Sequence, residues 1–351
     1  MAPCNLEVVT QAGNGCAGHT DDIHVGLDHP AQGAASGAVG HGAGVIVSNL
    51  LLLVACLAIG MLLQHSARTP ANAHQALNAV ILHVSLPAVT LRALHDFTFD
   101  PNQIWPVLMP WALFAIGAAA FWAIGKWLRL PRASVGALTL VGGLGNTSFV
   151  GLPMIESLHG LDGIGLGLLI DQLGSYLALA TIGIFVAALY AGNAPTSAPN
   201  MLRKIATFPP FIALVLAVVL RPVTFPAPLD AALARVGDTL APLALISVGL
   251  QLRLSAVRAQ ASLLSIGLGY KLVACPAIVF GVMWLFDADL DMTTRVSMIE
   301  AAMPPMIGAG IVAAEAGLDA PLVSTMIGLG IPIGLLTATL WHHAFALVFA
   351  A

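Results

Sequence analysis

The sequence predicts an all-α polytopic membrane protein of ten transmembrane helices, built as two inverted five-helix repeats. The first observation is composition: of 351 residues, 58% are hydrophobic and 9% are charged, whereas soluble domains carry roughly 25% charged residues. The second is a set of long apolar stretches, most of which approach the ~20 residues that a spanning helix needs. These stretches are 45–63, 76–94, 105–128, 134–158, 163–191, 203–220, 231–251, 259–286, 293–315 and 320–349.

Two of these stretches carry helix breakers deep in the predicted membrane. The fourth reads GGLGNTSFVGLPM over 142–154, and the ninth reads EAAMPPMIGAGI over 300–311. Proline removes a backbone donor and clashes with the preceding turn. An unpaired backbone group in hydrocarbon costs several kcal/mol, so broken backbone persists there only against protein or a watery cavity. Two breaks at matching places in two halves are typical of a transport site.

Short motifs repeat at a nearly constant offset along the chain. Gly-Leu-Asp at 160–162 recurs at 317–319, an offset of 157, and Leu-Pro-Ala at 86–88 pairs with Ala-Pro-Leu at 241–243, an offset of 155. A repeat of five helices is odd-numbered, so the second copy must enter the membrane upside down. The predicted divisions are a low-complexity tail (1–43), repeat 1 (44–191), a cytoplasmic linker (192–202) and repeat 2 (203–351).

The distribution of basic residues predicts the orientation of the chain. With the N-terminus outside, eight Lys and Arg lie on inside loops and four on outside ends, and residues 1–43 contain none. Basic residues concentrate on the cytoplasmic side, so we expect an N-out, C-out protein of the inner or plasma membrane. The tail holds His19, His24, His29 and His41. Their irregular spacing favours a disordered tail over a metal site.

Several motifs together resemble one known family. The fourth stretch contains GNTSFVGLP at 145–153, and the others are Leu-Pro-Ala at 86–88, Asp-Gln-Leu-Gly-Ser at 171–175, Ala-Met-Pro-Pro at 302–305 and Leu-Leu-Thr at 335–337. Over residues 45–349 the chain resembles the auxin efflux carrier (AEC) family, in its bacterial type because the linker is short. The resemblance implies ten helices, with helices four and nine broken and crossing near mid-membrane. One departure is Gly308, where members often carry Asn or Thr.

The resemblance also implies a function. Members move auxin in plants, and malonate, malate or lactate-like acids in bacteria. We therefore expect a secondary transporter, or permease, of small organic carboxylate anions that works by alternating access and is coupled to protons or a cation. An uncoupled uniporter or channel-like facilitator of the same anions is one alternative. A non-transporting membrane sensor with the same fold is another.

The two broken stretches supply the expected substrate contacts. A half-helix that begins at Asn146 offers free N–H groups and a positive dipole end to a carboxylate. Asn is also a common helix cap, so Asn146 has a structural reading that is compatible with the functional one. The prolines hold the backbone open, and the glycines permit close crossing. The substrate-binding candidates are Asn146, Thr147, Pro153, Met303, Pro304, Pro305 and Gly308.

Charged residues inside the helices are the candidates for ion or proton coupling. Each costs roughly 2.5–3.5 kcal/mol at the bilayer centre on insertion scales and marks a functional hypothesis. Asp171, Glu300 and Lys271 are the coupling candidates, with Lys271 also able to neutralise Glu300 or Asp238. The structural reading of Asp238 is an ion pair with Arg235, three residues earlier on the same helix. His83 could relay protons, although a lone histidine on an apolar face usually bonds to a neighbour.

Other classes of function have no support in the sequence. It contains no Gly-x-Ser-x-Gly motif, no His-Glu-x-x-His motif and no nucleotide-binding glycine-rich loop, so we expect neither an enzyme nor a cofactor. The four cysteines form no CxxC pair, so no metal site is expected. A basic stripe is absent, which argues against nucleic acid. The expected partners are a small organic acid anion and the lipid bilayer, and both a monomer and a homodimer remain open.

The orientation is testable with reporter fusions. Fusions placed after Asn72 and after Gly192 should both report the cytoplasm, because basic residues cluster on the loops nearest these sites. A periplasmic signal from either fusion would contradict the N-out topology.

Overall fold

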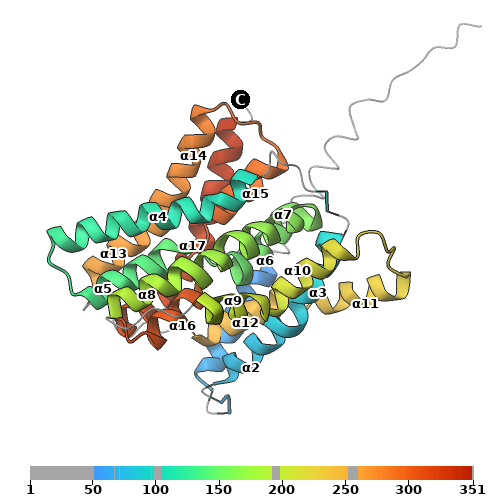
Figure 1. Ribbon diagram of the computed structural model, residues 1–351, viewed down its shortest axis with the longest axis horizontal. Helices are drawn as coiled ribbons and strands as arrows, with labels where there is room; N and C mark the ends of the chain where they lie inside the picture. The colour runs from blue at the N-terminus through green and yellow to red at the C-terminus, as the bar shows by residue number, and fades with distance from the viewer. Residues whose placement is uncertain are drawn as a thin grey trace, which may run out of the picture. The chain divides into compact units, whose positions relative to one another are not determined.

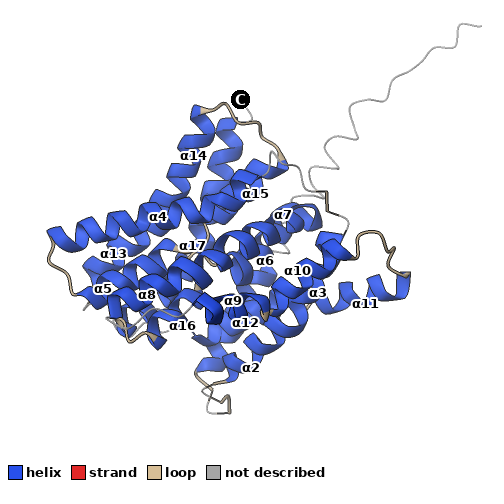
Figure 2. Cartoon of the chain, viewed as in Figure 1, coloured by secondary structure: helices blue, strands red, loops and turns tan. Residues whose placement is uncertain are grey.

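The computed structural model describes residues 51–66, 68–70, 72–95, 97–98, 104–191, 198–251 and 260–349. Within these ranges the regular elements are helices and there is no strand (Figure 2), which confirms the all-α prediction. The segments long and apolar enough to cross a membrane are Ala73–His95, Ile104–Trp127, Thr147–Ala191, Ala227–Gln251, Ala261–Leu285 and Ala320–Phe349. Shorter apolar helices are Leu51–Gln64 and Pro209–Val219. The predicted tail lies outside the described residues, as does most of the linker.

Many of the segments combine α-helix with π-helical turns, which are rare and frequently occur at functional sites. In the first half the elements are α2 (Ala73–Val80), η1 (Ile81–Ser85), α3 (Leu86–His95), α4 (Ile104–Trp127), α5 (Arg132–Ala137), η3 (Leu138–Gly142), η4 (Thr147–Gly151), α6 (Leu152–His159), η5 (Gly160–Gly163), α7 (Ile164–Leu169), η6 (Ile170–Tyr176), η7 (Leu179–Gly183) and α8 (Ile184–Ala191). Of these, η1, η3, η4, η6 and η7 are π-helical and η5 is a 3₁₀ turn.

The second half follows with α9 (Ala198–Ala206), α10 (Pro209–Val219), α11 (Ala227–Gly237), α12 (Leu240–Gln251), α13 (Ala261–Gly269), the π-helical η8 (Tyr270–Ala274), α14 (Cys275–Leu285), α15 (Met292–Ala301), α16 (Ile307–Glu315) and α17 (Ala320–Phe349).

The two Gly-Leu-Asp motifs have a common local geometry. Gly160 has φ +66° after α6 and Gly317 has φ +71° after α16, a backbone region that favours glycine. The chain reverses at Gly160, so that α7 returns along α6. The two helices lie close together, because a Cβ on Gly167 of α7 would lie 3.1 Å from Leu152 Cδ2 of α6.

The helices sort into two bundles. In the first bundle α3 packs against α10 and α11, and α12 packs against α2. The helix Leu51–Gln64 joins this bundle, because Gly60 lies against the backbone of Gly249 in α12. The second bundle contains α4–α8 and α13–α17, with α17 touching α13, α15 and α16. In Figure 1 the labels α2, α3, α10, α11 and α12 gather at the lower right, apart from α4, α13 and α14.

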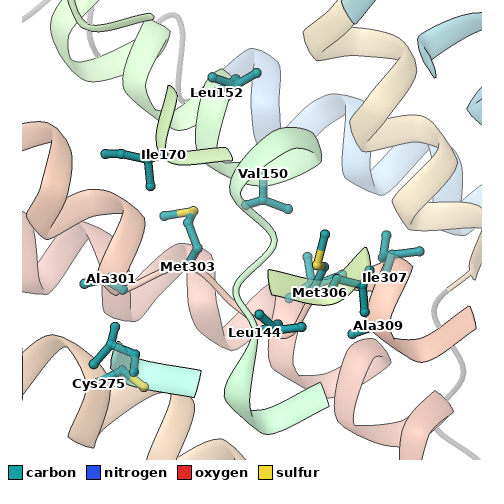
Figure 3. Packing of buried hydrophobic residues seen from close by; sticks show 14 of the residues in the cluster. Leu144, Val150, Leu152, Ile170, Cys275, Ala301, Met303, Met306, Ile307 and Ala309 are labelled. Carbon is teal, nitrogen blue, oxygen red and sulfur yellow. The ribbon is translucent and has the colours of Figure 1, made fainter. Parts of the chain in front are cut away.

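The two broken segments cross inside the second bundle. Residues 144–146 and 302–306 leave the helical conformation, and Gly145 and Pro305 form an antiparallel β-bridge. Asn146 N donates to Pro304 O at 2.8 Å, and Met306 N donates to Leu144 O at 3.0 Å. Figure 3 shows the extended stretch at Leu144 running past Met303 and Met306. Each break therefore supplies hydrogen-bond partners to the other, and the crossing that the family resemblance implies is present.

Helix α17 packs closely against the second break. A Cβ on Gly330 would lie 2.7 Å from Pro305 Cδ, and a Cβ on Gly334 would lie 2.6 Å from Pro304 Cβ. These glycines are four residues apart, so they share one face of the helix. Both neighbours are rigid proline rings in a buried stretch, so neither can move aside cheaply. The glycine face of α17 therefore fixes the position of the two prolines.

We predict that Gly334→Ala destabilises the protein by about 1–3 kcal/mol, the usual range for overpacking a well-packed core. The matched control is Gly281→Ala in α14, where an added Cβ meets nothing within 4 Å and alanine favours the helix. Thermal melting of both variants in detergent measures the difference. Equal melting temperatures would show that α17 does not hold the crossover.

Candidate functional site

Polar side chains gather around the crossover although its surroundings are apolar. They come from the first break, from η6, from η8 and from the end of α15. None of them is more than 2% exposed. A buried charge or polar group is costly unless it is paired, so this concentration calls for a reason other than folding. The members are Asn146, Thr147, Asp171, Ser175, Lys271 and Glu300.

Asn146 caps the second half of the first broken helix and keeps its amide group free. Its Oδ1 accepts a hydrogen bond from Phe149 N at 3.2 Å, so the capping reading is correct. Its Nδ2 is buried and has no partner among the described residues. An unsatisfied buried donor loses about 1–3 kcal/mol of solvation. The amide is therefore poised to donate to an acceptor that enters the crossover.

Asp171 connects η6 to the first residues of η4. Its Oδ1 accepts hydrogen bonds from Thr147 Oγ1 at 2.5 Å and from Ser148 Oγ at 2.8 Å. A charged residue placed this close to the unwound backbone can respond to any ligand bound there. The structure thus brings together the predicted substrate contact Thr147 and the predicted coupling residue Asp171.

Lys271 and Glu300 line the same cavity at the crossover. Lys271 Nζ donates to Ala301 O at 3.4 Å, and a Cβ on Gly145 would lie 3.1 Å from the same nitrogen. Both carboxylate oxygens of Glu300 lack a hydrogen-bond partner in the described chain, and one of them lies 2.5 Å from the Cβ position of Gly151. Lys271 and Glu300 form no ion pair within 4.0 Å, so the pairing expected from the sequence is absent in this state.

A small closed cavity lies among these groups. Its volume is about 10 Å³, room for roughly one water molecule. Ser175 Oγ and the Glu300 carboxylate face it without partners among the described residues. Its lining is Met109, Pro110, Leu113, Gly143, Gly145, Thr147, Ser175, Lys271 and Glu300. The crossover is therefore polar, enclosed and incompletely hydrogen-bonded.

A larger cavity, which we call the vestibule, lies between the two bundles. Its volume is about 500 Å³, and its walls come from α3, α6, η5, α7, α11 and α12. Its charged lining residues are Arg92, Glu156, Asp162, Asp230 and Asp238. Leu152 and Gly165 line it too, while Gly151 and Gly167 lie against Glu300. The Glu300 carboxylate thus lies one residue layer behind the vestibule wall.

The vestibule corrects one expectation about Asp238. The predicted ion pair between Arg235 and Asp238 is not formed; instead Arg92 Nε pairs with Asp230 Oδ1 at 2.8 Å. Asp238 lines the vestibule, whereas Lys271 lines the small cavity at the crossover. Sequence reasoning missed the vestibule, because its charges come from separate helices. The repeated Gly-Leu-Asp motif that contains Asp162 was the one available signal.

The other predicted residues take mainly structural positions. Pro304 and Pro305 lie in the unwound stretch, and Met303 beside them is fully buried. Pro153 lies in the first turn of α6 and not in the break.

Two more positions lie away from the polar cluster. A Cβ on Gly308 would meet Leu179 Cδ2 at 3.3 Å, so this position faces η7. His83 Nδ1 lies 2.9 Å from Ala79 O on its own segment, which matches the simple reading of a histidine bonded to a neighbour.

Comparison with known proteins identifies the family of this chain. Residues 45–342 match the family described as membrane transport protein, which confirms the resemblance to the auxin efflux carriers. An uncharacterized transporter of Methanothermobacter thermautotrophicus is 26% identical over 273 residues, covering 76% of this chain and 87% of that protein. An uncharacterized transporter of Methanocaldococcus jannaschii is 24% identical over 275 residues, with the same coverage of 76% and 87%. Both relatives are archaeal.

Proposed function

The chain belongs to the membrane transport protein family, and from that premise we propose that it is a secondary transporter of small organic carboxylate anions. The anion binds at the crossover, and the two bundles alternate its access to the two sides of the membrane. The single observation that carries the proposal is the free Asn146 amide at a break flanked by half-helix N-termini. The ten-helix inverted repeat, with an N-out and C-out orientation, is part of the same proposal.

Three sources of positive potential support an anion at the crossover. The half-helices that begin at η4 and α16 each place unpaired N–H groups and about half a positive charge at their N-termini. The Asn146 amide adds a neutral donor. The Lys271 side chain is the third source. The sequence did not predict Lys271 at the crossover, because this residue belongs to η8 and not to either broken helix. In an enclosed site these charges act more strongly than in bulk water.

The carboxylates support ion coupling. Lys271 and Glu300 line the same small cavity as Thr147, which donates a hydrogen bond to Asp171. Two buried carboxylates beside one ammonium leave negative charge without a partner, and Glu300 has no hydrogen bond to offset its burial. A proton or a small cation would supply the missing partner. We therefore assign Asp171 and Glu300 to ion coupling, with Lys271 shared between coupling and anion binding.

The charge of the vestibule supports a route for the coupling ion. Its walls carry four carboxylates against one guanidinium, and a cleft of one sign raises the local concentration of oppositely charged solutes. Protons and cations are thus concentrated in the vestibule, whereas carboxylate anions are depleted there. The proposal therefore places cation entry at the end that carries Asp162.

We predict that Asn146→Ala weakens binding of the organic acid by about 1–3 kcal/mol, the range for a lost hydrogen bond to a charged group. Isothermal calorimetry measures this, after a thermal-shift screen has identified the acid. Asn146→Asp keeps the capping oxygen and replaces the donor with a negative charge, so it should weaken binding further.

Asp291→Ala is the matched control for loss of a cap. Asp291 caps α15 through Thr294 N at 2.8 Å, away from the crossover, so this variant should lose stability and keep its affinity for the acid. Equal affinities of the parent and Asn146→Ala, or tighter binding of the amide analogue than of the acid, would remove the anion site.

We predict that Asp171→Asn impairs ion-coupled transport more than it impairs folding. Asparagine retains an oxygen that can accept from Thr147 and Ser148, but it cannot take up a proton or balance a cation. Counterflow in proteoliposomes under imposed pH or sodium gradients measures the coupling, and Ser148→Ala is the control that removes one hydrogen bond without changing charge. A parent that ignores both gradients would be an uncoupled facilitator, and one that moves no acid at all would be a sensor.

A further inference from the structure

The π-helical segment η6 presents two different faces. Asp171 and Ser175, four residues apart, face the crossover: Asp171 bonds to η4, and Ser175 lines the closed cavity. Gln172 and Tyr176, also four apart, face the first bundle. Residues with this spacing lie on one side of a helix. One short segment thus touches both the proposed ligand site and the opposing bundle.

The contact with the first bundle is a buried side-chain hydrogen bond. Gln172 Nε2 donates to Thr90 Oγ1 of α3 at 2.7 Å, and neither residue is exposed. The long-range side-chain bonds described above stay within one bundle, but this one crosses between the two. Gln172 Oε1 has no partner in the described residues. The amide would therefore be left with no hydrogen bond at all if the bond to Thr90 broke.

A ring contact lies next to this bond on the same face. Tyr176 stacks on Phe208, which precedes α10 of the first bundle, with ring centroids 3.8 Å apart and an interplanar angle of 12°. A hydrogen bond and a flat stack fix both the register and the distance of η6 against the first bundle. The bundles cannot slide past one another at this point without breaking both contacts.

We propose that Gln172 and Thr90 are positioning residues that couple the crossover to the relative position of the bundles. The coupling rests on the proposed function, since it transmits the state of the anion and ion site. Asp171 directly precedes Gln172, so a change of charge or ligand at Asp171 moves η6 and strains the Gln172–Thr90 bond. The bond stabilises the state seen here, in which the vestibule is open.

Cysteine accessibility in the vestibule tests this proposal without any knowledge of the substrate. Leu161 lines the vestibule and is 59% exposed. In a variant whose four native cysteines are replaced by alanine, Leu161→Cys is labelled in proteoliposomes with a membrane-impermeant maleimide. Gln172→Met and Thr90→Val each remove the bond with little change of shape. Each should shift the equilibrium between open and closed vestibule about three- to tenfold towards the closed state, as expected for a lost buried bond, and so lower the labelling rate by up to that factor.

The double variants and controls make the test specific. Gln172→Met combined with Thr90→Val should label no more slowly than the slower single variant, because both remove the same bond. Asp171→Asn should change the labelling rate in the parent and have no further effect in Gln172→Met. Thr90→Ser keeps the hydroxyl and should label like the parent, and melting curves report folding for each variant.

Three outcomes would overturn the proposal. These are unchanged labelling in Gln172→Met, additive effects of Gln172→Met and Thr90→Val, or an effect of Asp171→Asn that persists in Gln172→Met. Should Thr90→Val fail to fold, Gln172→Met, alone and combined with Asp171→Asn, still decides the first and third outcomes. Failure of the anion site would instead appear in the Asn146 calorimetry and leave the labelling pattern intact.

Discussion

The arrangement of this protein depends on how two interrupted helices satisfy their backbones away from water. Each break exposes N–H and C=O groups that hydrocarbon cannot hydrogen-bond. The breaks solve this jointly, because Asn146 N bonds to Pro304 O and Met306 N bonds to Leu144 O. Neither segment could hold this conformation alone. The crossing in turn requires close approach of α17 and brings together two half-helix N-termini, of η4 and α16, and the C-termini of the preceding elements, η3 and α15.

The helix breaks and most of the helical segments could be predicted from the sequence, because the residues that determine them are close together in the chain. Pro304 and Pro305 break a helix wherever they occur, and Asn146 beside glycines marks a half-helix start. The apolar stretches predicted the positions of most helical segments, and the repeated Gly-Leu-Asp motif marked two turns that share a positive φ at Gly160 and Gly317. Pro153 was the exception: it lies in the first turn of α6, where proline is compatible with a helix, so it does not widen the break.

The features of the site that the sequence did not predict depend on contacts between segments far apart in the chain. The sequence shows that Lys271 is an intramembrane charge but not that its ammonium group reaches Ala301 O beside the crossover. The sequence shows Arg235 and Asp238 three residues apart on one helix, which is a spacing that allows an ion pair. In the structure the ion pair forms instead between Arg92 and Asp230, and Asp238 lines the vestibule. Long side chains choose partners in three dimensions, and periodicity along one helix cannot rank those choices.

Charge balance at the crossover links anion binding to ion movement. With Asp171 and Glu300 ionised and Lys271 protonated, the cluster carries one net negative charge, and a bound carboxylate would add another. Uncompensated like charges in an enclosed, low-dielectric site repel one another strongly, and the partial charges of two helix N-termini together offset only about one unit. The proposed anion site is therefore stable when a proton or cation arrives with the anion or before it. The proposed ion coupling would then arise from the charged residues of the site itself.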